Sequence, residues 1–354
     1  MTTGRAAAWR SYSPAAFWRK RLSRYRTRRL LEVHLLVLLM CGVVAVTALL
    51  VSYRQTQRDA DALASREAPA VQGLAAARLA ALRADWEVQV LVELNLVDVA
   101  GSGETYRAQL SAADQGLSRI ADRTDQDLGT VNGLLATYGN SLSLGTSKYR
   151  DQALMREQKL DEASSLLTRT GVGLAPRLNA LQQVQMRHAE ATAGLGWVQR
   201  TGWWLAELAL AAFALTLFSA LFVLRDRCGR DWNPFLIAAF VITVVLSIVP
   251  LLTASSTRDD LDSAVGHLRY ITDVSQQSCC DHPPGRAAVL AAAEKLASAQ
   301  GTVTERSEEV RRKLADDAWT DRVYQGSLIG GLLIVVLPAM GLVLRLDSDY
   351  WRRR

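Results

Sequence analysis

Four long apolar runs divide the chain into polar segments of unequal length. The runs cover residues 34–53, 202–224, 234–255 and 324–344. Each run can cross a bilayer as a helix, which takes about 20 apolar residues. The pattern therefore predicts four transmembrane helices. A cleaved signal peptide is the competing interpretation of the first run, but the run is too long for one, and no small-residue cleavage site follows it.

The polar segment 54–200 carries apolar residues three and four positions apart. This spacing is typical of amphipathic helices. Because the chain must return to the membrane, it needs an even number of antiparallel helices, and a four-helix bundle with short loops meets this condition. Pro69 should kink the helix that leaves the first span. The predicted helices cover residues 70–100, 106–142 (as one helix or two), 148–170 and 178–195, the last of which runs into the second span.

The polar segment 256–323 repeats this scheme in a smaller form. An apolar stripe continues outward from the third span, residues 279–285 form a turn with two prolines, and residues 286–322 return as a helix into the last span. We therefore predict a helical hairpin. Packing of this hairpin beside the four-helix bundle would give a unit of six helices.

The net charge of +6 is unevenly distributed. Residues 1–33 carry nine Lys or Arg and one acid, whereas residues 54–200 carry sixteen bases and seventeen acids, and residues 256–323 carry nine bases and twelve acids. Cytoplasmic loops of membrane proteins are enriched in Lys and Arg. The basic N-terminus, the short loop 225–233 and the tail 345–354 are therefore predicted to be cytoplasmic, and the two long polar segments extracytoplasmic.

The predicted fold class is an all-α integral membrane protein of the plasma membrane, with both termini in the cytoplasm. Four transmembrane helices carry an extracytoplasmic four-helix bundle and a second extracytoplasmic helical hairpin. The predicted order is a cytoplasmic N-terminus (1–33), first span (34–53), bundle (54–200), second span (202–224), cytoplasmic loop (225–233), third span (234–255), hairpin (256–323), fourth span (324–344) and cytoplasmic tail (345–354).

The basic N-terminus has apolar residues at roughly helical spacing among its arginines, which favours an amphipathic helix on the cytoplasmic leaflet. Its position beside a span makes anionic lipid a better partner than nucleic acid. The same arginines would also suffice as a topology signal without any partner. The predicted lipid-facing residues are Arg19, Lys20, Arg21, Arg24, Arg26, Arg28 and Arg29.

Two adjacent cysteines, Cys279 and Cys280, lie at the tip of the predicted hairpin and precede Asp281 and His282. Thiols outside the cytoplasm tend to oxidise. A bond between neighbours is strained, because their Cα atoms lie about 3.8 Å apart. A bridge to a second chain avoids this strain and would make a homodimer. Metal binding is the lesser alternative, since metal sites normally use spaced ligands.

Two further features lie in the predicted spans. Glu207 is the one acid well inside a span, and an ionisable residue in the membrane is a functional candidate. It lies one turn from Trp203 and Trp204, so a structural role at headgroup depth is an equal alternative. Gly326 and Gly330 place small residues four apart in the last span, which allows close helix contact.

No phosphate-binding loop, zinc-ligand spacing or nucleophile motif stands out in the sequence. We therefore predict a protein that is not an enzyme and that has no catalytic residues, metal or cofactor. A channel or transporter is a third class of function, but polar residues are scarce in the four spans.

The first half of the chain resembles the four-helix-bundle sensor domain of bacterial chemoreceptors. The whole chain resembles, in its topology, the actinobacterial four-span membrane protein that acts between an extracytoplasmic amino-acid-binding lipoprotein and protein kinase G. This resemblance implies a solute-binding protein as partner outside and a kinase or other effector inside. We therefore expect a signal relay. The alternative is a structural scaffold or an accessory subunit of an envelope or transport complex.

Overall fold

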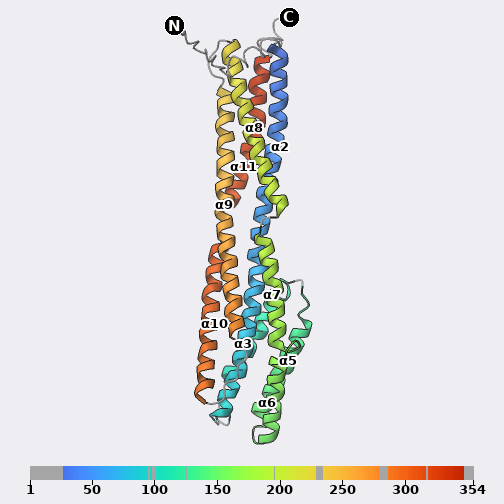
Figure 1. Cartoon of the computed structure of the whole chain (residues 1–354), viewed down its shortest axis with the longest axis vertical. Coiled ribbons are helices and arrows are strands. Elements are labelled where there is room, and N and C mark those ends of the chain that lie inside the picture. The colour runs from blue at the N-terminus through green and yellow to red at the C-terminus, as the bar shows by residue number, and fades with distance from the viewer. Residues whose placement is uncertain are drawn as a thin grey trace, which may run out of the picture. The chain divides into compact units, whose positions relative to one another are not determined.

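The computed structural model describes residues 27–94, 96–97, 101, 103–124, 126–194, 196–228, 234–278, 286–315 and 318–346 (Figure 1). These residues form helices joined by short turns, and no strand occurs among them. The prediction of an all-α chain is therefore confirmed for this part of the sequence.

The chain divides into two compact units. The apolar unit comprises Met1–Tyr53, Val198–Leu252 and Arg322–Arg354, and the polar unit comprises Arg54–Trp197 and Thr253–Asp321. The elements in chain order are α2 (Thr27–Ala62), the π-helical turn η1 (Leu63–Glu67), α3 (Ala68–Glu93), α4 (Glu104–Ala121), α5 (Gly129–Ser143), the π-helical turn η2 (Leu144–Lys148), α6 (Ala153–Thr168), α7 (Leu174–Ala193), α8 (Trp197–Cys228), α9 (Pro234–Gln277), α10 (Arg286–Leu314) and α11 (Ala318–Leu346).

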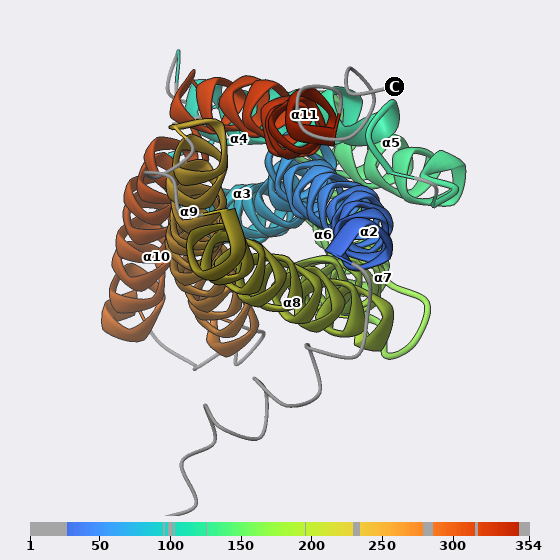
Figure 2. The same cartoon turned by 90° about the horizontal axis from the view of Figure 1, so that it is seen from above.

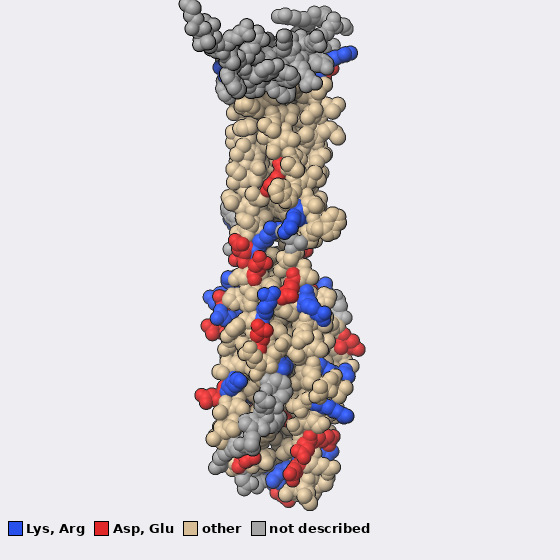
Figure 3. All heavy atoms as spheres, in the orientation of Figure 1, with Lys and Arg blue, Asp and Glu red and all other residues tan. Residues whose placement is uncertain are grey.

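The apolar unit contains parts of four helices that are long and apolar enough to cross a membrane. These lie within Glu32–Glu93, Gln199–Val223, Pro234–Gln277 and Arg322–Leu344. Large apolar side chains such as Leu36, Leu215 and Phe222 are more than half exposed on this unit. In the space-filling view, the part formed by α2, α8 and α11 is almost free of charged side chains (Figure 3). An apolar surface of this extent is typical of a multi-pass membrane protein.

Helix α3 is the central helix of the polar unit. It is rich in alanine, and most of its residues from Ala68 to Val88 are buried. It packs against α4, α7 and α10, and in the view along the helices it lies between α10 and α5 (Figure 2). The contact with α4 is close because a Cβ added at Gly73 would come within 2.6 Å of Ile120. Small residues on α3 thus allow several helices to surround it.

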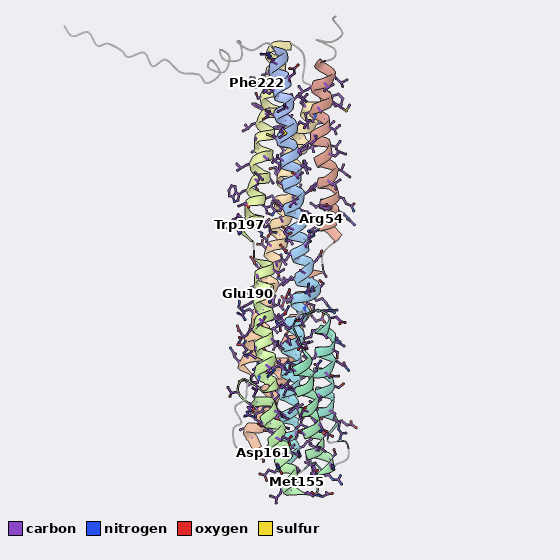
Figure 4. All side chains as sticks on the ribbon, turned by 90° about the vertical axis from the view of Figure 1, so that its right-hand side faces the viewer. Arg54, Met155, Asp161, Glu190, Trp197 and Phe222 are labelled. Atoms are coloured by element: carbon purple, nitrogen blue, oxygen red, sulfur yellow. The ribbon has the colours of Figure 1, made fainter. Side chains whose placement is uncertain are left out.

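The polar unit contains helices α3 to α7 of the first polar segment. The segment predicted as one helix or two is two helices, α4 and α5, with Tyr106 near the start of α4 and Thr146 just beyond α5 joined by a hydrogen bond of 2.7 Å. Helices α6 and α7 follow the turn η2. Figure 4 shows Met155, Asp161 and Glu190 following one another along the polar unit in that order. The predicted third and fourth helices, α6 and α7, thus lie one after the other along the polar unit.

The second polar segment joins the same hydrophobic core. Leu261 and Leu268 of α9 and Val303 of α10 are buried in one cluster with Leu74 of α3 and Leu117 of α4. The polar unit thus combines α3 to α7 with the far half of α9 and with α10. Burial of these apolar faces together is the main source of its stability.

Pro69 is accommodated without breaking the helix. Proline has no N–H to donate to the carbonyl four residues earlier, and its ring crowds that carbonyl, so an α-helical turn is disfavoured there. The chain instead makes the π-helical turn η1, in which Ala68 N–H donates to Leu63 O, and α3 then begins with Pro69 in its first turn. At the position where a kink is predicted, the structure therefore has one wide π-helical turn.

The sequence predicts a continuous helix between each of the four spans and the adjoining polar segment. Two of these four connections are uninterrupted. The boundary between the two units falls inside α2 and inside α9. In contrast, α7 ends at Ala193 and α8 begins at Trp197, so the fourth predicted stripe does not run into the second span. The physical reason is Gly194, whose extended backbone, with φ −71° and ψ 137°, ends α7. Helices α10 and α11 are also separate, ending at Leu314 and beginning at Ala318.

Candidate functional site

Several residues singled out in the sequence lie outside the described residues. These are Arg19, Lys20, Arg21, Arg24 and Arg26 in the N-terminal segment, and Cys279 and Cys280 between α9 and α10. Arg28 and Arg29 belong to the first turn of α2, where the side chain of Arg29 is exposed. The lipid and disulfide predictions stay predictions.

Glu207 lies on α8 and is half-buried. No hydrogen bond or ion pair joins its carboxylate to the rest of the described chain. Its neighbour Trp203 is buried, whereas Trp204 is 63% exposed. The structure therefore does not bring Glu207 together with a second polar group.

The glycines of α11 make unequal contacts. A Cβ at Gly330 would lie 3.2 Å from Leu246 of α9, and a Cβ at Gly331 would lie 2.8 Å from Val46 of α2. At Gly326 the same addition meets nothing within 4 Å. The close packing of α11 in the apolar unit is thus at Gly330 and at Gly331, rather than at Gly326.

The polar unit contains a group of buried polar side chains that sequence analysis did not single out. We call Arg78 of α3, Gln182 of α7, and Thr272 and Ser275 of α9 the polar layer. Each side chain is at most 6% exposed. The Gln182 amide donates to Thr272 Oγ1 at 3.2 Å, and Ser275 Oγ donates to Gln182 Oε1 at 3.1 Å. These three side chains satisfy one another across α7 and α9.

Arg78 is the charged member of the polar layer. Its guanidinium donates one hydrogen bond, to the backbone oxygen of Ser275, while its Nε is buried and has no partner. Burial lowers the pKa of the Arg78 guanidinium to about 10, which still leaves it protonated at neutral pH. No carboxylate of the described residues forms an ion pair with it. A buried cation without a counter-charge is costly, because transfer out of water is not repaid by a partner.

The oxygen that Arg78 contacts belongs to the last turn of α9, which ends at Gln277. The last four carbonyls of a helix have no partner within the helix and carry partial negative charge. Arg78 therefore caps the end of α9 through its Nη1, whereas its Nε does not take part. This contact joins α3 to α9 within the core of the polar unit.

A second buried charged residue, Asp85, lies two turns further along α3 and is 4% exposed. It accepts a hydrogen bond of 2.8 Å from Gln89. Burial raises the pKa of the Tyr138 hydroxyl well above its usual value, and the negative charge of Asp85 adds to this effect. Tyr138 therefore remains a neutral donor, and its hydroxyl lies 3.2 Å from Ala81 O.

The sequence does contain a signal for Arg78. It falls four residues after Leu74 and four before Leu82, so it occupies a position in the apolar stripe of the predicted helix. Its neighbours Ala75, Ala77 and Ala81 are all apolar. A single arginine at the centre of such a face indicates a buried cation.

Among the described residues, no group of three or more His, Cys, Asp or Glu side chains is placed to hold a metal ion. Comparison of the chain with protein-family models, with curated proteins and with solved structures finds no match.

Proposed function

We propose that this protein is a non-catalytic membrane relay that passes an extracytoplasmic binding event to a separate cytoplasmic partner. The observation that carries the proposal is the continuity of two helices. Helices α2 and α9 each belong in part to the apolar unit and in part to the polar unit. A change in packing of the polar unit can therefore act on helices whose other ends are candidate spans.

The polar layer supports the same proposal. A relay needs two arrangements of its sensing part that a ligand or partner binds unequally. Arg78 holds the last turn of α9 through a single contact, and it keeps unused donors in a buried site. A group that offers those donors a better partner would favour a second arrangement of α3 and α9.

The proposed sidedness rests on charge. Basic residues collect at 1–33, 225–233 and 345–354, which we assign to the cytoplasm under the positive-inside rule. Reporter fusions at Gly145 and Gly285 should then give an extracytoplasmic signal, and a fusion after Arg354 a cytoplasmic one. A cytoplasmic signal at Gly145 or Gly285 would overturn this topology and the relay with it.

The relay itself can be tested in the native host. The measured response is the change in phosphorylation of cytoplasmic proteins when amino acids are supplied outside, the stimulus that the family resemblance suggests. We expect deletion of the gene to abolish the response and the full-length chain to restore it. A chain that lacks residues 70–190 but still gives an extracytoplasmic signal from a fusion at Gly285 should not restore it. If it does, the scaffold alternative takes the place of the relay.

A further inference from the structure

We propose that Arg78 is the anchor of a binding site for a small carboxylate anion, formed with the other residues of the polar layer between α3, α7 and α9. The charge of Arg78 and its hydrogen-bond partners do not match. Arginine carries five N–H donors, and the Arg78 guanidinium uses one of its nitrogens, Nη1, for a contact with the carbonyl oxygen of Ser275. That carbonyl is a neutral acceptor and leaves the formal charge of Arg78 uncompensated.

The carboxylates nearest to Arg78 along α3 have other partners. Asp85 accepts from Gln89 at 2.8 Å, and Glu87 pairs with Arg83 at 3.4 Å. Arg83 provides a contrast to Arg78 on the same helix, because it is paired and also donates to Gln300 at 2.7 Å. Arg78, which is 3% exposed, is thus both the more buried of the two arginines and the one without a carboxylate.

The surroundings of Arg78 favour a carboxylate over other anions. A planar guanidinium matches the two oxygens of a carboxylate in a bidentate pair. The remaining members of the polar layer are neutral amide and hydroxyl groups, so the site offers one positive charge. One charge balances a monoanionic carboxylate, whereas a phosphate with nearly two negative charges would need a second cation.

The site lies close to the end of α9. Ser275 is fully buried, but Gln277, two residues further on, is exposed and is the last residue of the helix. A carboxylate that pairs with Arg78 through Nη1 and Nη2 would replace the Ser275 carbonyl as the partner of Nη1 and release the last turn of α9. This coupling rests on the proposed relay function, whereas binding at Arg78 does not depend on it.

The test uses the full chain purified in detergent, with acetate as the probe. The measured quantity is Tm in sodium acetate, sodium chloride and sodium phosphate at equal ionic strength. Since a ligand that binds only the folded state raises its stability, we expect acetate to raise Tm by about 2–4 °C above chloride at a concentration a few times its Kd. Phosphate should give no rise that depends on Arg78, because its general stabilising effect is the same with or without this side chain.

Three variants locate the effect. Arg78→Met should abolish the acetate-specific rise, and Arg78→Lys should reduce it to less than half because lysine lacks the bidentate fork. Arg83→Met, the matched control on α3, should keep it. In chloride, Arg78→Met should have a Tm at or above that of the wild type, because an apolar side chain of similar size removes an uncompensated buried charge. A residue needed only to cap α9 would instead lower Tm when replaced.

The outcomes separate the proposal from its rivals. Absence of an acetate-specific rise in the wild type, or its persistence in Arg78→Met, overturns the site. A rise with phosphate that depends on Arg78 overturns the carboxylate assignment. Should Arg78→Met not fold, an undiminished rise in Arg78→Lys has the same meaning as persistence in Arg78→Met. Binding that survives while the cellular response proves independent of residues 70–190 would leave the site standing and remove the relay.

The coupling has its own readout. Hydrogen exchange of the backbone amides at 272–277 should become faster in acetate than in chloride for the wild type, because the cap on α9 is released. It should not change with the anion in Arg78→Met. Equal exchange in both anions for a wild type that binds acetate would show that the site is not coupled to α9.

Discussion

Asparagine in place of Leu117 is expected to lower the free energy of unfolding of the polar unit by about 3–5 kcal/mol. Leu117 lies on α4, is 1% exposed and belongs to the core that α3, α9 and α10 share. The substitution removes apolar volume and also buries an amide that finds no ready partner. Thermal unfolding of the full chain in detergent should show the loss as a Tm lower by roughly 10 °C.

Leu154 provides the matched control for this prediction. It is also a leucine in a helix of the polar unit, α6, but it is 82% exposed. Leu154→Asn should change the unfolding free energy by less than about 0.5 kcal/mol, as is usual for surface substitutions. Equal losses for the two variants would mean that the shared core described here does not exist.

Alanine in place of Gly331 is the second change with a large expected effect. Its added methyl group would lie 2.8 Å from one γ-carbon of Val46 and 3.2 Å from the other. Valine is stiff at χ1 in a helix, so it cannot easily move aside. Overpacking of this kind costs about 1–3 kcal/mol. We expect a clear decrease in Tm and weaker association of α11 with α2.

The neighbouring glycines form a graded series of controls. Gly330→Ala meets the flexible side chain of Leu246 at 3.2 Å and should cost less than Gly331→Ala. Gly326→Ala meets nothing within 4 Å and should be neutral or slightly stabilising, because alanine is the better helix former. A loss at Gly326 as large as that at Gly331 would contradict this order and would point to a further helix packed at Gly326.

The features that the sequence predicts well are those with a long repeating signal. The four apolar runs and the stripes of residues three and four apart extend over many residues, so helix type and number of spans follow from them. Places where a few residues decide the outcome are harder to predict. Gly194 ends α7 by adopting an extended backbone, and a single glycine in a helical pattern can equally well be tolerated.

The polar layer was missed for a related reason. A periodic apolar pattern is identified from the apolar residues that form most of it. Arg78, which lies among the alanines and leucines of α3, is therefore treated as an exception on an otherwise apolar face. Its partner Ser275 lies 197 residues further along the chain. Only the packing of α9 against α3 brings the two together, and local periodicity contains no information on that pairing.

The π-helical turn before Pro69 also fixes the rotational phase of α3 relative to the end of α2. A π turn accommodates one residue more than an α turn, and one residue corresponds to a rotation of about 100° around the axis. The buried face of α3, with Arg78 on it, is thus offset from the face that an unbroken α-helix would present. Loss of one residue between Leu63 and Glu67 would convert the turn to an ordinary one and leave both flanking stretches in register, whereas loss of one residue just after Pro69 would turn Arg78 away from α9.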